Sequence, residues 1–348
     1  MTRTRNSKLA LPAAVVALVA CSSDGSKSDR QSTVAATTAV SVAATTTPTS
    51  SSTAADTSGR PAVQKIIDVG GGQLLGMAAS EDAIWAISFD NGALVKIDPV
   101  TNDVATSVRI SQAGSVLSND GDVWVARYGF GTSGGGIDRV DASSAAKVAS
   151  IAAGDVCCDL TFGDDLLWLL DAQGTLRSID PSSNTIGSEF PVAVDRNAHS
   201  NVVYGGGYLW ASSDTTRLHR IDRRTGDIVD FDVGGGVPFV ERDGLVWGAS
   251  PTAVWAVDAE TGEVQRHIDL QRSIEVLSLD VGSSTIWVGV RRPGRVGEVR
   301  HIDIGTGEVL DQFADVDIPA HIVLAFDSVW VTDSGSSNVV RIGPFTDT

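Results

Sequence analysis

Short runs of alternating apolar and polar residues dominate the chain from residue 63 onward. Residues 104–110 alternate in this way, as a strand with one solvent-exposed face does. Residues 166–170 are apolar throughout, as expected for a strand that is covered on both faces. No segment keeps the 3.6-residue period of an amphipathic helix. The pattern therefore predicts an all-β protein and argues against a TIM barrel or a doubly wound fold.

Tryptophans recur in this region at intervals of about 40 residues. The ladder consists of Trp85, Trp124, Trp168, Trp210, Trp247, Trp287 and Trp330. A repeat of this length built from strands is typical of a β-propeller, in which one blade cannot bury its own faces and needs its neighbours. We therefore predict a seven-bladed β-propeller with the ladder tryptophans between adjacent blades. Trp255 lies outside the ladder and is expected to pack locally.

A second repeat follows most of the tryptophans and consists of an apolar residue, an aspartate and a turn. An aspartate can accept a hydrogen bond from the backbone two residues later, and glycine or asparagine supplies a positive φ at the end of the turn. We expect these aspartates to form the hairpin between the third and fourth strands of each blade. They are Asp98, Asp141, Asp180, Asp222, Asp258 and Asp303. The seventh repeat has lost its aspartate.

The last repeat is one strand short. It has strands at residues 322–325, 329–332 and 338–342, after which few residues follow. A spare strand at residues 63–69 precedes the first inner strand. We predict that this N-terminal strand pairs with residues 338–342 and closes the ring, because closure removes the exposed edges of an open sheet array.

The first residues resemble a bacterial lipoprotein leader. A basic start is followed by an apolar stretch at residues 9–20, which is too short for a comfortable membrane span, and then by Cys21. We predict a signal peptide at residues 1–21 with a lipidated Cys21, which would anchor the protein on the extracytoplasmic side of the cell membrane. Residues 22–61 are rich in Ser, Thr and Ala and are predicted to form a disordered tether. The propeller is expected at residues 62–348.

Charge and cysteine content restrict the partners. The chain has 26 basic and 43 acidic residues, a net charge of −17, which disfavours nucleic acid and anionic polymers. Two cysteines besides Cys21 are adjacent, Cys157 and Cys158. In an exported protein they could form a vicinal disulfide, stay as buried thiols or serve a metal or redox role, and the sequence leaves these alternatives open.

Ligands of propellers usually bind at the mouth of the central channel, which is surrounded by the loops that enter the inner strands and join the second and third strands. Candidates in these loops are Arg127, Tyr128, Asp155, Cys157, Cys158, Asp159, His199, Glu275, Arg291, Arg292 and His321. The alternative for the histidines is a structural hydrogen bond, and for the arginines a solvated surface. No hydrolase, zinc-protease, Cys-x-x-Cys or Walker motif is present. No catalytic residue, metal ligand or cofactor is therefore assigned, with Mg²⁺ or Ca²⁺ left open.

Two phrases resemble the repeats of YVTN-type propellers, at residues 329–342 and 96–102. They are also similar to the broader group that contains streptogramin B lyase. The resemblance covers residues 63–348 and implies a seven-bladed fold. The streptogramin lyases use a histidine-containing, Mg²⁺-assisted site, and no local motif here allows those residues to be carried over. Residues 257–262 also resemble the repeats of quinoprotein dehydrogenases, but those are typically eight-bladed, and seven repeats argue against a quinone cofactor.

Three classes of function stay open at this point. The favoured one is a monomeric, membrane-anchored propeller that binds a small molecule, a glycan or a protein at the channel mouth. The second is an enzyme of the lyase or hydrolase kind, with His199, Glu275 or His321 as acid–base groups. The third is a structural protein of the cell envelope with an acidic exterior.

Overall fold

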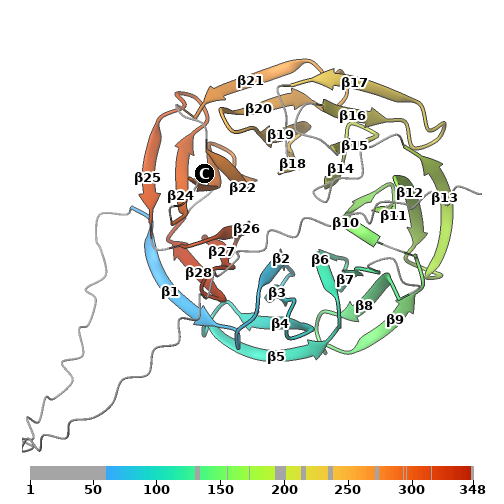
Figure 1. The fold of residues 1–348 in the computed structure, drawn as a ribbon, viewed down its shortest axis with the longest axis horizontal. Coiled ribbons are helices and arrows are strands. Elements are labelled where there is room, and N and C mark those ends of the chain that lie inside the picture. Colours follow the sequence, from blue (N-terminus) through green and yellow to red (C-terminus); the bar gives the residue numbers. More distant parts are fainter. Residues whose placement is uncertain are drawn as a thin grey trace, which may run out of the picture. The chain divides into compact units, whose positions relative to one another are not determined.

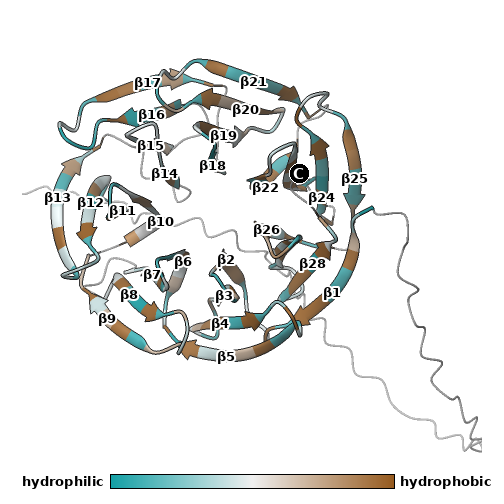
Figure 2. Ribbon diagram, turned by 180° about the vertical axis from the view of Figure 1, so that it is seen from behind, coloured by the Kyte–Doolittle hydropathy of each residue, from teal (hydrophilic) through white to brown (hydrophobic). Residues whose placement is uncertain are grey.

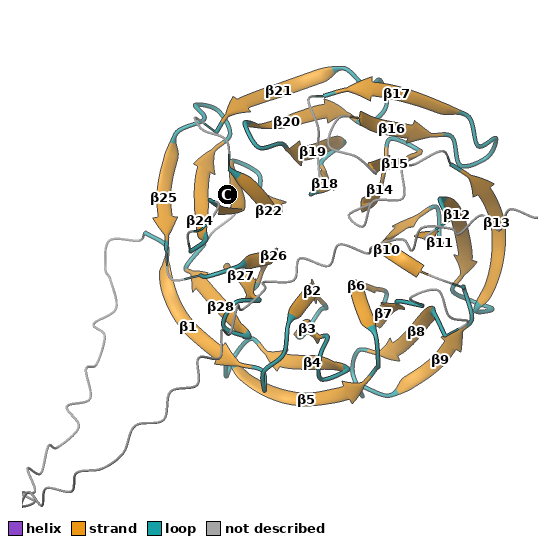
Figure 3. Ribbon diagram, in the orientation of Figure 1, coloured by secondary structure: helices purple, strands orange, loops and turns teal. Residues whose placement is uncertain are grey.

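The computed structural model describes residues 60–129, 134–154, 156–171, 173–192, 201–212, 217–233, 238–270, 274–292, 294, 296–314 and 316–345. All regular elements in these ranges are β-strands, as Figure 3 shows. No helix of the described residues is long and apolar enough to cross a membrane. The predicted leader, Cys21 and all but the last residues of the predicted tether lie outside the described ranges.

The strands form seven antiparallel four-stranded sheets around a central axis (Figure 1), which confirms the predicted seven-bladed propeller. The first three blades consist of β2 (Leu74–Ala79), β3 (Ile84–Ser88), β4 (Ala93–Asp98) and β5 (Asp103–Arg109); β6 (Ala113–Asn119), β7 (Asp122–Arg127), β8 (Gly136–Asp141) and β9 (Lys147–Ile151); and β10 (Val156–Gly163), β11 (Leu166–Asp171), β12 (Thr175–Asp180) and β13 (Thr185–Pro191).

The fourth to seventh blades follow in chain order. They consist of β14 (Asn201–Gly205), β15 (Tyr208–Ser212), β16 (Arg217–Ile221) and β17 (Ile228–Asp232); β18 (Phe239–Arg242), β19 (Leu245–Ala249), β20 (Ala253–Asp258) and β21 (Val264–Asp269); β22 (Glu275–Val281), β23 (Thr285–Arg291), β24 (Glu298–Asp303) and β25 (Val309–Phe313); and β26 (Pro319–Ala325), β27 (Ser328–Asp333), β28 (Asn338–Gly343) and β1 (Ala62–Asp68). Brown and teal segments alternate along the outer strands in Figure 2, in agreement with the sequence pattern.

The ladder tryptophans lie at the seams between blades, as predicted. Each is at most 3% exposed and belongs to an apolar cluster that joins its own blade to the next one. Trp330 of the seventh blade, for example, shares a cluster with Leu74 and Ile84 of the first. Trp255 packs within its own blade, as expected, and also belongs to the same seam cluster as Trp210. Gly248 leaves room for it, since a Cβ there would lie 2.2 Å from the Trp255 ring.

Four of these seams also carry a cation above the indole ring, and each cation reaches the next blade. The four residues are Lys96, Arg139, Arg220 and Arg341. Arg341 lies 4.9 Å from the centroid of Trp330 and donates a hydrogen bond to the carbonyl of Pro99 in the first blade, at 2.6 Å. One side chain thus contributes a cation–π contact within its blade and a hydrogen bond across the seam.

The turn aspartates behave as the sequence predicts. Asp98 Oδ1 accepts the backbone N–H groups of Val100 and Thr101, at 2.7 and 3.1 Å. The equivalent aspartates of the next five blades accept hydrogen bonds in the same way. Asn102 and Gly262 end two of these turns with φ of 61° and 79°.

Strand β1 lies antiparallel to β28 as the outer strand of the last blade, with Ala62 opposite Gly343 and Asp68 opposite Asn338. Ile67 of β1 is only 4% exposed and belongs to the cluster at the seam between the seventh and first blades. The seven inner strands contact one another in sequence, and β26 contacts β2. The first and last strands of the described propeller, β1 and β28, thus belong to the same sheet.

Removal of β1 is expected to destabilise the whole ring. Deleting residues 1–69 exposes the β28 edge and loses the apolar contacts of Ile67, whereas deleting residues 1–59 leaves every described residue in place. A loss of about 3–6 kcal/mol, from one or two buried side chains and their strand, should lower the melting temperature of the shorter protein by about 10 °C. Thermal melts of the two truncations measure this difference. Equal melting temperatures would show that β1 does not close the ring.

Candidate functional site

The seven inner strands begin at the same end of the ring, which we call the entry end. Because the strands of each blade are antiparallel, the turns between third and fourth strands lie at the opposite end, which we call the turn end. The described candidate residues lie near the starts of inner strands or at the ends of second strands, so they belong to the entry end. They do not, however, form one group there.

Four side chains form an interacting cluster at the entry end, which we call the axial cluster: Ser115 of β6, Tyr128 after β7, Asp159 of β10 and His321 of β26. Ser115 donates a hydrogen bond from Oγ to Asp159 Oδ1 at 2.9 Å. Tyr128 and His321 both interact electrostatically with Asp159. The cluster therefore joins residues from the second, third and seventh blades.

Strand register explains why these residues meet. Ser115, Asp159 and His321 each lie two residues before the inner-strand residue that pairs with the ladder tryptophan. They therefore occupy equivalent positions in three blades. The equivalent residue of the first blade, which lies between β26 and β6 in the ring, is Gly76, which contributes no side chain. Gly114 makes room for Tyr128, since a Cβ at this position would lie 1.9 Å from its ring.

Irregular pairing precedes this layer of residues in most blades. The pairing of β2, β6, β10, β22 and β26 with their second strands shifts register just before or within this position. Such bulges twist a strand and redirect the side chains beside them, and they are frequent next to binding and active sites. Bulges are thus repeated around the entry end, while the side chains beside them differ from blade to blade.

Burial controls the protonation of the axial cluster. Burial raises the pKa of Asp159 above its ordinary value, and the nearby His321 and the Ser115 hydrogen bond oppose this only in part. Burial lowers the pKa of His321, with Asp159 opposing. Burial also raises the pKa of Tyr128, and the charge of Asp159 adds to this effect. His321 is therefore neutral at neutral pH, and the phenol of Tyr128 keeps its proton.

Asp159 and His321 lie on strands at opposite sides of the axis and keep free polar atoms. Three steps around the ring separate β26 from β10 in one direction and four in the other, so the two strands lie on opposite sides (Figure 1). Among the described residues, only Ser115 donates a hydrogen bond to Asp159, and it uses Oδ1. Neither ring nitrogen of His321 has a hydrogen-bond partner in this part of the chain. Both side chains are partly exposed to solvent.

The remaining candidates are placed differently. Arg127 forms an ion pair with Asp138 at 3.2 Å and donates to the carbonyl of Gly134, so it belongs to a network within the second blade. Arg291 donates two hydrogen bonds to Glu275 Oε2, at 3.0 and 2.8 Å, in the sixth blade. The exposed side chain there is Arg292.

Four candidates are not tested by this structure. Asp155 and His199 lie outside the described residues, and of Cys157 and Cys158 only the backbone is described, as part of β10. The alternatives for the cysteine pair therefore stay open. Within the described ranges, no three His, Cys, Asp or Glu side chains are grouped closely enough to hold a metal ion.

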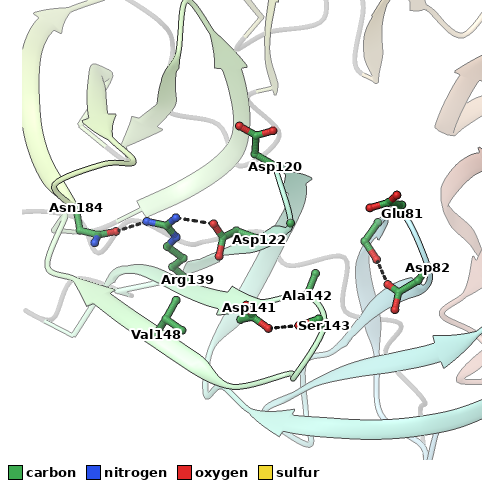
Figure 4. A pocket seen from close by; sticks show the side chains of 12 residues that line it. Glu81, Asp82, Asp120, Asp122, Arg139, Asp141, Ala142, Ser143, Val148 and Asn184 are labelled. Carbon is green, nitrogen blue, oxygen red and sulfur yellow. Dashed lines mark hydrogen bonds and ion pairs between the residues drawn. The ribbon is translucent and has the colours of Figure 1, made fainter.

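A hollow of about 670 Å³ lies at the turn end, between the first three blades (Figure 4). Its acidic lining consists of Glu81, Asp82, Asp120, Asp122 and Asp141. Several of these charges are used by the fold: Asp82 pairs with Lys96, and Asp122 pairs with Arg139. The hollow was not predicted from the sequence, and its polar groups belong to the seam and turn contacts described above.

Comparison with known proteins supports the fold. No family model and no curated protein matches the chain. Streptogramin B lyase superposes with a TM-score of 0.65 and 14% identity, over 80% of this chain and 96% of that one. BamB from Moraxella catarrhalis gives 0.55 and 17%, over 77% and 82%. The computationally designed Ika8 protein gives 0.59 and 11%, over 79% and 98%. At these identities the likeness concerns the propeller fold alone.

The lowered pKa of His321 predicts a specific pH dependence of stability. Between the folded pKa and the ordinary value near 6.5, the unfolded chain binds a proton that the folded chain does not, so stability falls as the pH is lowered through this window. The His321→Gln variant lacks this contribution and should lose less unfolding free energy than the wild type between about pH 7 and about pH 5. Denaturant unfolding at the two pH values measures the difference. Parallel losses in both proteins would contradict the lowered pKa of His321.

Proposed function

We propose that this protein is a membrane-tethered propeller outside the cytoplasmic membrane that binds a small molecule at the axial cluster. The observation that carries the proposal is the pair Asp159 and His321, which lie on strands at opposite sides of the axis with polar atoms that the described fold does not use. A closed ring of strands fixes the backbone positions of both residues, as a preformed binding site requires.

Asp159 has fewer partners than Asp138 and Asp333, two buried acids of the propeller. Asp138, 1% exposed, contacts two cations, and Asp333, 3% exposed, accepts three backbone N–H groups. A partly exposed carboxylate with few protein partners can accept hydrogen bonds from a ligand. Asp159 has one neutral hydroxyl donor. A bound ligand would supply the missing partner.

The geometry favours a binding protein over a catalyst. A general base is usually oriented by a third group and converges with a second functional group on one reacting atom. Among the described residues, no side chain orients the ring of His321 by a hydrogen bond, and Glu275 is engaged by Arg291. An enzyme of the lyase or hydrolase kind is therefore the second candidate, with the untested His199 as the residue on which it depends.

A ligand screen tests the proposal. The compact unit, residues 59–348, is screened by thermal shift against metabolites, glycans and divalent ions. A ligand at a hundred times its dissociation constant should stabilise the wild type by about 2.7 kcal/mol. The double variant Asp159→Asn, His321→Gln should lose this stabilisation, while the matched double variant Glu275→Gln, Arg291→Met at the same end should keep it. A ligand whose effect survives the first double variant binds elsewhere.

The tether is tested separately from the site. We expect the wild type to partition into the detergent phase of a Triton X-114 extract and the Cys21→Ser variant into the aqueous phase, because about 0.8 kcal/mol per buried methylene holds an acylated chain in the membrane. Intact-mass analysis of the purified wild type should show the added lipid on the residue at position 21. An unmodified, water-soluble wild type would leave the leader as an ordinary secretory signal.

A further inference from the structure

The free atoms of the axial cluster are mainly acceptors. Asp159 Oδ1 is occupied by the Ser115 hydroxyl, which leaves Oδ2 as an acceptor. A neutral imidazole has one nitrogen with a lone pair and one with a proton, so His321 adds a second acceptor from the opposite side of the axis. No lysine or arginine of the described residues forms an ion pair with Asp159. A ligand group that enters here therefore meets a carboxyl group with no cationic partner.

Aromatic rings lie beside this acceptor pair. Tyr128 packs over Gly114, and its ring lies 6.3 Å from the ring of Phe89 at a tilt of 47°. Both residues are partly exposed at the entry end. Aromatic faces attract cations and cover hydrocarbon equally well. The net charge of −17 also attracts positive rather than negative ligands to the protein.

We propose that the axial cluster selects a small organic ammonium ion, whose N–H groups donate to Asp159 Oδ2 and to His321 while its hydrocarbon part lies against Tyr128. The proposal deepens the proposed function and rests on it. An ammonium group is a donor only, so it satisfies both acceptors at once. An anion would meet the carboxylate of Asp159, and a neutral alcohol would leave the charge uncompensated.

Binding of this class is coupled to proton release. The titratable side chains that act on Asp159 are Tyr128 and His321, and burial raises the pKa of the Asp159 carboxyl. When the ammonium ion binds to the protonated form, the Asp159 O–H bond breaks, its proton passes to solvent and an N–H···O⁻ hydrogen bond takes its place. Acid therefore competes with the ligand for the same oxygen, and affinity falls as the pH is lowered.

Three probes with the same ring and different head groups test the class: benzylammonium, benzyl alcohol and benzoate. Each is titrated by isothermal calorimetry into residues 22–348, which contain every described residue. We expect benzylammonium to bind at least about tenfold more tightly than benzyl alcohol, and benzoate to bind most weakly. We expect the benzylammonium affinity to fall between about pH 7 and about pH 5, where the probe itself stays protonated.

Two variants locate the effect. Asp159→Asn should weaken benzylammonium binding by at least about tenfold, reduce its pH dependence and leave benzyl alcohol unchanged. Glu275→Gln removes an equal charge at the entry end outside the axial cluster and should leave all three affinities unchanged. The comparison of the three probes on the wild type does not depend on either variant folding.

The outcomes separate the ligand class from the function. Equal affinity for benzylammonium and benzyl alcohol, with both lost in Asp159→Asn, would overturn the ammonium class and leave a small-molecule site in place. An equal loss of benzylammonium binding in Glu275→Gln would also overturn it, because the general field of the protein would then be responsible. Binding of none of the probes would overturn the ammonium class, while the ligand screen described above decides the proposed function itself.

Discussion

No blade of this protein buries both of its faces alone, and the indole at each seam supplies the contact that the blades share. Each ladder tryptophan is enclosed by residues of its own blade and of the next. The seam between the seventh and first blades, which we call the closing seam, has a buried indole like the others and further contacts beside it. Arg341 covers the Trp330 ring and donates hydrogen bonds to the carbonyl of Pro99 and to Asn102 Oδ1 of the first blade. The ring is therefore stabilised seam by seam, and the last seam ties the end of the described chain to its beginning.

The axial cluster depends on this closure. Asp159 and His321 belong to the third and seventh blades, and the direct path between their strands runs through the first and second blades and across the closing seam. Their positions across the axis are thus fixed by seam contacts at the tryptophan clusters rather than by local sequence. Seam contacts also use the charged residues at the turn end. Asp122 and Arg139, which line the hollow there, take part in the contact between the second and third blades.

The fold was predictable because its determinants are local and repeated. A tryptophan followed by an Asp-containing turn occurs within a single blade, so Trp85 and Asp98 reveal their roles without any knowledge of the rest of the chain. The site was predictable only in part. Tyr128, Asp159 and His321 were among the candidates because they lie near the entry end.

Ser115 was missed, and Arg127 was placed beside Tyr128 although it turns toward Asp138. Both outcomes depend on strand register, which bulges shift in β6 and β10 and which no local pattern records. Counting two residues back from the partner of each ladder tryptophan would have identified Ser115. That count requires the pairing between the inner and second strands, which only the structure provides.

The central claim is that the seams make the stability of each blade a property of the whole ring. Hydrogen exchange measured by mass spectrometry on the Trp210→Ala variant tests it most directly, because truncation of this buried indole should cost about 3–5 kcal/mol at the seam of the fourth and fifth blades. The account predicts that amide protection falls in β2 of the distant first blade as much as in β14 and β18. Unchanged protection in β2, with losses confined to the fourth and fifth blades, would contradict it.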